Sequence, residues 1–313
     1  MSGTAPFVTQ PELTAIAIAY MQRPGDFIAD QVMPRIPNPI NKREFEYQEY
    51  GLESYSRPDT RVGRKGRPNE VSWASREKTA AVEDFGLDDP IPQDDIDQGR
   101  KDGVNVTGQS TEYILSLVRL DRECRVAGMV QSDANYDAAN VQTLTEGQGL
   151  DNDEVDADGI IVDLLEKPMI RPNIGIMSSS VWGKVSRNAL LVKAIKGQLT
   201  GKKITPEDFC THFELDALLI GKSRKNRVVK GKNPILERVW GPHIAFHYRD
   251  LAASTQRGVT WGLTVPYGTP VSGALPDRDI GLRGGVRVRA GESLKELVLA
   301  PGAGCLIKHA IAG

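Results

Sequence analysis

The chain contains 313 residues with 39 basic and 41 acidic side chains, so its formal net charge is only -2. Hydrophobic residues make up 40% and charged residues 26%, a composition typical of soluble globular proteins that argues against long-range disorder. Proteins that bind nucleic acid as their main task are usually strongly basic, so the balanced charge disfavours a simple DNA-binding module.

Prolines dominate the first 40 residues, where six of them interrupt any regular element. Between two of them, residues 11–21 can form a short amphipathic helix with Thr9 as its N-cap. This segment has too little apolar surface to fold by itself. We therefore expect residues 1–40 to form an arm that lies on another surface.

Two strand-like runs follow at residues 43–50 and 71–79, and they predict a long two-stranded hairpin spanning residues 41–82. An isolated hairpin is marginally stable in water at best, so we expect a neighbouring surface to stabilise it. Its tip carries a group of basic residues, namely Arg57, Arg61, Arg64, Lys65 and Arg67.

The chain then becomes acidic over residues 83–102, and Pro90 and Pro92 exclude a helix through the middle of this stretch. The hairpin should carry its basic tip away from this stretch of its own chain. One interpretation is therefore an intersubunit pairing of the basic tip with Asp88, Asp89, Asp94 and Asp95. The alternative is two solvated surfaces of opposite sign, since exposed ion pairs contribute little to stability.

The clearest helix is predicted at residues 110–131, with a length of about 33 Å at 1.5 Å per residue. Its apolar positions recur at spacings of three and four and form one seam. The seam residues are Tyr113, Leu117, Leu120, Cys124 and Ala127, and the opposite, solvated face is expected to carry Arg119, Arg122 and Arg125.

An α/β block is predicted over residues 151–258. Helices are expected at residues 160–166, 180–186 and 206–215, the last with Thr205 as N-cap and Pro206 in its first turn. Strands are expected at residues 173–177, 217–220, 236–240 and 244–248. The end of the chain predicts further strands at residues 259–265, 286–289, 295–299 and 305–307.

No residue pattern points to catalysis, a cofactor or a metal. His243 and His247 share one face of a strand but have no third ligand nearby in the sequence. Residues 154–159 begin like a calcium loop, yet Leu165 stands where the bidentate Glu is needed. Gly221-Lys222-Ser223 resembles the end of a phosphate-binding loop without its first Gly. We therefore expect a protein that is not an enzyme.

A basic run follows this fragment, consisting of Lys222, Arg224, Lys225 and Arg227. Such a run is typical of a weak contact with nucleic acid or of a solvated loop. No aromatic residue is interleaved for base stacking, which favours the solvated loop.

The three cysteines are widely spaced without a CxxC pair, which indicates neither a disulfide framework nor a zinc site and favours a reducing compartment. No secretory signal is recognisable. The apolar run at residues 13–21 is shorter than the ~20 residues that cross a bilayer, so we expect a soluble protein without membrane contact.

Several stretches, in the same order along the chain, resemble the major capsid proteins of tailed bacteriophages with the Hong Kong 97-type coat fold. They are LTAIA (13–17), PDTRVGRK (58–65), DFGLDDPIP (84–92), LDRE (120–123), RPN (171–173), VWG (239–241) and RAGESLKEL (289–297). None is diagnostic alone, and the collinear set carries the resemblance.

The resemblance implies an α+β coat fold with four parts. Residues 1–40 would be the N-terminal arm and residues 41–82 an extended loop over a neighbour. Residues 83–150 and 259–313 would form the peripheral domain, with residues 110–131 as spine helix. Residues 151–258 would form the axial domain around the five- and six-fold axes.

The implied function is a major capsid protein that self-assembles into pentamers and hexamers of the icosahedral head of a tailed double-stranded DNA phage. The implied partners are a separate scaffolding protein, a portal, a cement protein, and packaged DNA contacted weakly and without sequence specificity. The protein would then be found in the virion, after assembly in the host bacterial cytoplasm.

Two other readings remain open on sequence grounds. A bacterial nanocompartment shell shares the coat fold but encloses a protein cargo. An enzyme would need a pocket with residues of shifted pKa, for which the sequence offers no candidates.

Overall fold

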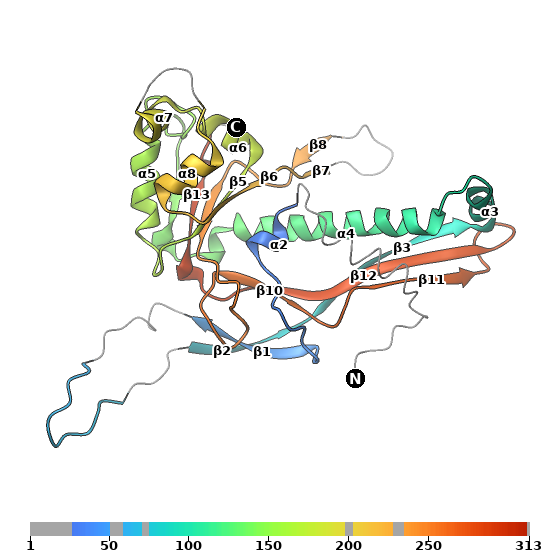
Figure 1. Ribbon diagram of the computed structural model, residues 1–313, viewed down its shortest axis with the longest axis horizontal. Coiled ribbons are helices and arrows are strands. Elements are labelled where there is room, and N and C mark those ends of the chain that lie inside the picture. Colours follow the sequence, from blue (N-terminus) through green and yellow to red (C-terminus); the bar gives the residue numbers. More distant parts are fainter. Residues whose placement is uncertain (1–26, 51–58, 71–74, 198–202, 228–234, 312–313) are drawn as a thin grey trace.

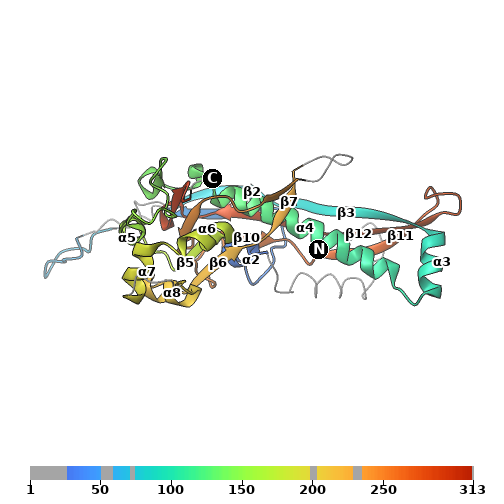
Figure 2. The same ribbon diagram turned by 90° about the horizontal axis from the view of Figure 1, so that it is seen from above.

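The structure is a computed structural model that describes residues 27–50, 59–70, 75–197, 203–227 and 235–311. Helices and strands are mixed along the chain, which confirms the expected α+β class. Figure 1 shows an elongated platform, in which one long helix lies along a sheet, and a compact lobe in which helices surround a second sheet. Seen from above in Figure 2, the platform helix and strands follow the long axis of the molecule.

The platform sheet is built around one long strand, β12 (Gly285–Val298). Strand β3 (Glu83–Pro92) pairs antiparallel with one edge of β12 over ten residue pairs. The other edge is shared by β11 (Val271–Asp277) and β10 (Gly262–Pro266), both antiparallel. The sequence predicted two strands, at residues 286–289 and 295–299, and this is corrected to one continuous strand.

Gly291 lies between the two predicted strands. A glycine inside a strand often marks a bulge, a bend or a close approach of backbones, and here it marks a close approach. Gly291 faces Gly86 across the ladder, and a Cβ at position 291 would lie 2.4 Å from the Phe85 carbonyl oxygen. Only glycine fits in this register.

The long helix α4 (Val106–Val130) begins four residues earlier than predicted. The Asn105 side chain caps it by accepting a hydrogen bond from the Gly108 N–H at 3.0 Å. Its buried apolar residues are Ile114, Leu115, Val118, Val126, Ala127 and Val130.

The predicted seam of α4 was therefore wrong by about one position. Tyr113 is 62% exposed, and Leu117, Leu120 and Cys124 are only half-buried. The predicted wet face was wrong as well, because Arg122 is buried and Arg125 is half-buried. The helix packs on two sides, so polar positions that the periodicity placed in water lie inside the molecule.

The chain leading into the hairpin packs on its own subunit from residue 28 onward. Ile28 and Met33 flank the short helix α2 (Ala29–Val32) and join the core beneath α4. Ile36 packs against β10, and isolated bridges link Arg35 to Thr264 and residue 40 to residue 267. The helix predicted at residues 11–21 lies outside the described residues.

The hairpin predicted at residues 41–82 is present. Strand β1 (Glu44–Tyr50) pairs antiparallel with β2 (Ser75–Ala81), with Glu44 opposite Ala81. The acidic stretch then forms β3 and, directly after Pro92, helix α3 (Gln93–Lys101). The expectation that no helix passes through Pro90 and Pro92 is confirmed.

The compact lobe contains a five-stranded sheet in the order β4-β13-β9-β5-β6. Its strands are β4 (Val141–Thr143), β5 (Ile174–Ser178), β6 (Ala217–Gly221), β9 (Ile244–His247) and β13 (Gly304–Lys308). Strands β4 and β13 come from parts of the chain that the sequence analysis assigned to the peripheral domain. Their hydrogen bonds place both strands in the lobe sheet.

Helices cover this sheet, and the predicted ones are present within a few residues. They are α5 (Ala157–Leu165), α6 (Ser179–Val185) and α8 (Pro206–Phe213), with the additional helix α7 (Ala189–Lys196). Thr205 and Asp208 form a reciprocal capping box at the start of α8. The described residues also form the 3-10 turns η2 (Asp133–Asn135), η3 (Ala138–Asn140) and η4 (Pro301–Ala303).

A small two-stranded ribbon, β7 (Arg224–Asn226) with β8 (Leu236–Arg238), projects from the lobe sheet beyond β6. Among the residues that the structure describes, no helix is both long enough and apolar enough to cross a membrane.

Candidate functional site

The tip of the hairpin, residues 59–70, is fully exposed and is here called the tip loop. A turn closed by the Gly66 N–H on the Gly63 carbonyl lies at its end, and the Asn69 side chain donates to the Asp59 carbonyl at 2.8 Å. Within the described part of the chain its cations Arg61, Arg64, Lys65 and Arg67 make no ion pair; Arg57 lies outside the described residues.

The acidic residues expected to meet the tip are largely engaged within their own subunit. Arg289 donates to both carboxylate oxygens of Asp88, at 2.6 and 2.7 Å, and these hydrogen bonds lower the pKa of Asp88. Arg283 pairs with Asp94 at 2.9 Å.

The remaining two aspartates, Asp89 and Asp95, differ in whether they have a hydrogen-bond partner. Asp89 accepts a hydrogen bond from the Ser110 hydroxyl at 2.6 Å, whereas Asp95 is exposed and has no partner among the described residues. The sequence thus identified an acidic surface but not which of its charges are already neutralised.

The basic run lies on the projecting ribbon. Lys222, Arg224 and Arg227 are exposed, while Lys225 is half-buried. Ile235 and Leu236 are 59% and 64% exposed on the same ribbon, which the sequence analysis did not anticipate.

The Gly-Lys-Ser fragment at the start of this run has a structural role. A Cβ on Gly221 would lie 2.1 Å from the Trp240 ring, so glycine is required there. The Ser223 hydroxyl is buried beside the carboxylate of Glu123 at 3.4 Å.

The histidines do not form one site. The His247 ring is buried, stacks on Trp261 with centroids 3.7 Å apart, and has Nε2 2.7 Å from the Tyr136 hydroxyl. His243 instead packs edge-on against His309. The calcium-like sequence is explained by Asp156, which caps α5 by accepting from the Gly159 N–H at 3.1 Å.

The most elaborate polar site is one that sequence reasoning missed, a buried carboxylate in the middle of α4. Glu123 accepts hydrogen bonds from the backbone N–H groups of Ile28 at 3.0 Å and Ala29 at 2.8 Å. It also accepts from the Trp240 indole N–H at 2.6 Å. Burial raises the pKa of Glu123, and these hydrogen bonds partly oppose the rise.

Its neighbour Arg122 is also buried and connects other segments. Its guanidinium pairs with Asp30 and donates to the Thr264 hydroxyl at 3.0 Å. Burial alone would raise the pKa of Asp30, but the cations Arg122 and Arg35 together lower it. Arg122 and Glu123 thus fasten residues 28–30 to the platform. The only sequence signal was two adjacent charges inside a helix.

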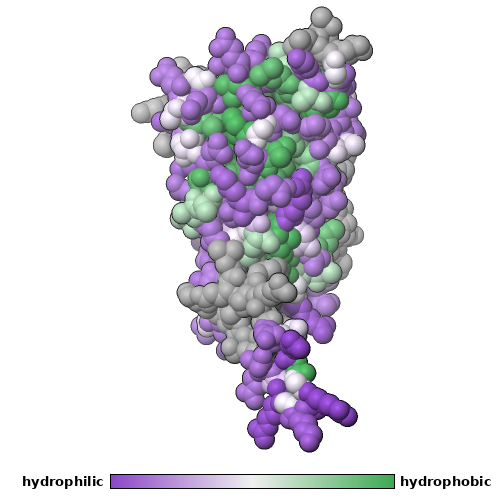
Figure 3. All heavy atoms as spheres, turned by 90° about the vertical axis from the view of Figure 1, so that its left-hand side faces the viewer, coloured by the Kyte–Doolittle hydropathy of each residue, from purple (hydrophilic) through white to green (hydrophobic). Residues whose placement is uncertain are grey.

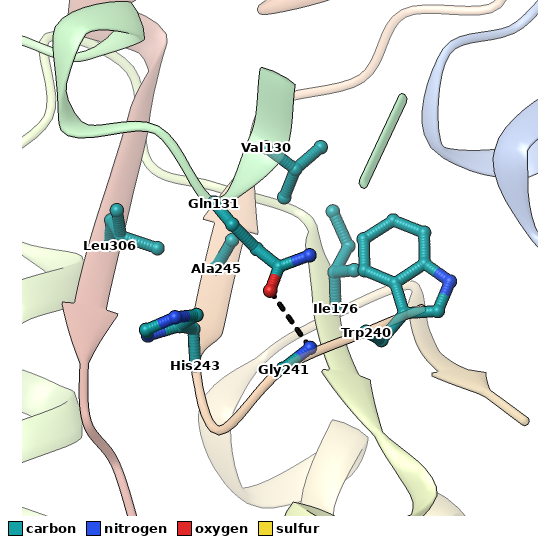
Figure 4. Close-up of a pocket in the computed structure, with 8 residues that line it drawn as sticks. All are labelled: Val130, Gln131, Ile176, Trp240, Gly241, His243, Ala245 and Leu306. Atoms are coloured by element: carbon teal, nitrogen blue, oxygen red, sulfur yellow. Dashed lines mark hydrogen bonds between the residues drawn. The ribbon is translucent and has the colours of Figure 1, made fainter. Parts of the chain in front are cut away.

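A cavity of about 10 Å³ lies beside this site, between the end of α4 and β9. Figure 4 shows Gln131 at its centre, with its Oε1 accepting from the Gly241 N–H at 2.8 Å. Trp240, Ile176 and His243 complete its walls. This volume is enough for about one water molecule and too small for an organic substrate.

Figure 3 shows apolar side chains gathered on the end of the molecule formed by the compact lobe, above the polar tip loop. The lobe's exposed apolar residues include Val162 on α5, at 39%. Apolar surface of this kind, together with an exposed basic loop, is typical of proteins that bind other subunits.

Comparisons with known proteins agree with this picture, although no family model matches the chain. The chain is 43% identical over 312 residues to the major capsid protein of Pseudomonas phage JBD67, covering 99% of each.

Among solved structures, a phage-related protein from Bordetella bronchiseptica RB50 matches with a TM-score of 0.75 at 18% identity, covering 98% of this chain and 99% of that one. A putative capsid protein of a prophage in E. coli CFT073 matches with a TM-score of 0.59 at 9% identity, covering 97% and 99%. The capsid of cyanophage P-SCSP1u matches at 0.56 and 12% identity, covering 98% and 92%.

Proposed function

The chain belongs to the family of major capsid proteins of tailed phages, and from this we propose that it assembles as pentamers and hexamers into the icosahedral head of a double-stranded DNA phage. The observation that carries the proposal is the identity of 43% over the full length. A nanocompartment shell is not favoured, because this relative comes from a phage. The role is structural and gives the protein its place in the virion capsid.

Four assembly parts are assigned under this proposal. Residues 1–40 serve as the arm, whose part from residue 28 onward packs on its own platform. Residues 41–82 serve as a loop over a neighbour, and the platform with α4 as the peripheral domain. The compact lobe forms the axial domain around the symmetry axes. This assignment is supported by the long hairpin that projects from the platform and the apolar end face of the lobe.

Further partners are part of the same proposal. A separate scaffolding protein, a portal and a cement protein would act during assembly in the host cytoplasm. Packaged DNA would be contacted weakly at Lys222, Arg224, Lys225 and Arg227, which the exposure of three of these side chains supports.

The tip loop is proposed to contact a neighbouring subunit through its cations. Four cations without partners among the described residues, on a loop that is exposed throughout, support this. Of the four aspartates considered from the sequence, Asp95 is the one without a described partner, so it is the best candidate in the acidic stretch.

Reversing the tip charges tests the proposal. The triple variant R61E/R64E/R67E should fold normally, because these side chains are exposed, but should form at least tenfold fewer closed shells. Shells would be counted by negative-stain electron microscopy after co-expression with the neighbouring genes.

The matched control is R61K/R64K/R67K, which keeps the charge and should assemble. Normal shells from the charge-reversed variant would refute the role of the tip. The absence of shells, sheets or capsomers from the unaltered protein would refute the assembly function itself.

A further inference from the structure

The carboxylate of Glu123 lies where separate segments of the chain meet, and its two oxygens serve different segments. Oε2 accepts hydrogen bonds from the N–H groups of Ile28 and Ala29, at 3.0 and 2.8 Å, at the start of α2. Oε1 accepts from the Trp240 indole N–H at 2.6 Å and from the Ser223 hydroxyl at 3.4 Å. The Ile28 N–H is shared, because it is also 3.0 Å from Oε1.

The two side chains bound to Oε1 stand at the two roots of the β7–β8 ribbon. Ser223 directly precedes β7, and Trp240 is separated from the end of β8 by Val239 alone. The Val239 N–H donates to the Ser223 carbonyl at 3.1 Å, which closes the ribbon at its base. Glu123 therefore holds the base of the ribbon and the start of α2 at the same time. Figure 1 shows α2 against α4 and the ribbon projecting alongside the same helix.

The carboxylate depends on these donors because no cation neutralises it. Glu123 is completely buried and forms no ion pair among the described residues. The adjacent Arg122 pairs with Asp30 instead. A buried charge is tolerated only when hydrogen bonds replace its hydration, and a partly satisfied one is costly.

The least favourable arrangement is therefore the one in which a single segment has left. If the start of α2 withdraws, water has to enter and hydrate Oε2. The hydrogen bonds from Trp240 and Ser223 then lose the dry surroundings that strengthen them. The same holds for α2 if the base of the ribbon moves, because coupling between two binding events is reciprocal.

We propose that Glu123 couples the seating of residues 28–29 to the position of the β7–β8 ribbon, so that both segments are bound together or released together. Residues 1–26 precede the first segment, and the ribbon carries exposed cations at Arg224 and Arg227. A partner that displaces the start of α2 would thereby reposition these cations. Both segments belong to one subunit, so the coupling goes beyond the assembly function and does not require it.

The variant Glu123→Gln separates coupled segments from independent ones. A carboxylate offers an acceptor on each oxygen, whereas an amide offers one acceptor oxygen and an NH₂ donor. Glutamine can therefore satisfy the donors of only one segment. Independent segments would lose one set of hydrogen bonds and keep the other, whereas coupled segments lose both.

Two measurements on the unassembled subunit follow the two segments separately. Hydrogen exchange resolved to single residues reports the N–H groups of Ile28 and Ala29, whose acceptor among the described residues is Glu123. Exchange there should become faster in E123Q, roughly tenfold or more relative to β12. The indole N–H signals in an NMR spectrum report Trp240, and its signal should shift toward that of a solvated indole.

The variant Trp240→Phe releases the ribbon side and should be felt at α2. It removes the indole N–H but keeps an aromatic ring, and it also assigns the indole signal. Exchange at Ile28 and Ala29 should again rise roughly tenfold or more. Trp261→Phe is the matched control, because Trp261 is buried in the same core and its indole N–H has no partner among the described residues. This control should leave exchange at residues 28 and 29 unchanged.

Deletion of residues 1–29 releases the other side, since it removes both backbone donors at the start of α2. The Trp240 indole signal should then shift as it does in E123Q. Deletion of residues 1–26 keeps both donors and should leave the signal in place.

The proposal is overturned if E123Q changes one measurement and leaves the other as in the unaltered subunit. It is also overturned if W240F and W261F accelerate exchange at residues 28 and 29 equally. If E123Q does not fold, W240F with its control decides the question. Shell formation is measured separately on the assembled protein, so failure of the coupling and failure of the assembly function are distinguishable.

Discussion

Single buried polar residues, more than apolar ones, decide how the segments of this chain are joined. Glu123 holds the start of α2 by two backbone N–H groups, and it also holds the Trp240 indole. A buried carboxylate left without these donors would cost several kcal/mol, so the contacts are obligatory. The sequence could not predict this, because charges at helix positions 122 and 123 have the pattern of a solvated face.

The buried His247 makes the free energy of unfolding depend on pH, which can be measured. The Tyr136 hydroxyl donates to the Val130 carbonyl at 2.7 Å, so the Nε2–H of neutral His247 donates to that hydroxyl. Burial holds the pKa of His247 well below its usual 6.5. Below pH 6.5 the His247 side chain of the unfolded chain binds a proton, whereas the buried side chain of the folded chain does not. The free energy of unfolding therefore falls as the pH falls.

Between pH 7.5 and 5.5 this linkage amounts to about 1.4 kcal/mol of unfolding free energy. Urea unfolding of the unassembled subunit at both pH values measures it, and His247→Gln should lose this part of the dependence. Burial raises the pKa of Glu123, whose contribution therefore has the opposite sign, and it cancels in the comparison of the two proteins. An unchanged difference in the variant would contradict the assignment to His247.

At the scale of elements, local patterns predicted what local interactions decide. Helices α5, α6 and α8 were expected within a few residues, since each has a capping side chain and a periodic apolar face. Strand β3 and helix α3 were missed, because β3 contains Pro90 and Pro92 and is held by β12, some 200 residues away. Pairing over such a separation leaves no local signal in the sequence.

The segment before the hairpin, residues 28–36, is expected to be needed for the stability of the subunit. Ile28, Val32, Met33 and Ile36 are all buried, at 8% exposure or less. Their removal would cost about 1.5–3 kcal/mol each, which together is comparable with the whole stability of a typical domain. Deletion of residues 1–40 should therefore abolish cooperative thermal unfolding, measured by circular dichroism.

Deletion of residues 1–26 is the matched control, because it leaves the Glu123 contacts to residues 28 and 29 in place. This shorter deletion should keep a cooperative transition. A cooperative transition at an unchanged temperature after deletion of residues 1–40 would show that the segment is a free arm throughout.

For the whole molecule, the collinear resemblance predicted the fold class and the family. The placement of charges relative to one another could not be predicted in the same way. Asp88 and Asp94 appeared free in the sequence but pair with Arg289 and Arg283, which approach only in the folded subunit. The hydrogen bond from the Gln48 N–H of β1 to the Thr255 carbonyl, at 3.0 Å, likewise joins segments that are distant in the sequence.

Hydrogen exchange can compare the backbone amides of the unassembled subunit with those of the assembled shell. Exposed backbone N–H groups exchange fast, and those in sheet ladders exchange slowly. In the unassembled subunit the tip loop should exchange fast, as should the N–H groups of Glu44 and Glu46, whereas Phe45 and Tyr47 are protected by β2.

In the assembled shell the tip loop should become protected, at least tenfold, while Phe45 and Tyr47 change little. Mass spectrometry with fragmentation to single residues separates the amides of the tip loop from those of β1. General compaction of the shell would slow the amides of β1 as well, so protection confined to the tip loop supports a contact of the tip with a neighbour. Equal exchange of the tip loop in both states would mean that it stays in solvent after assembly, and the hairpin would then need another source of stability.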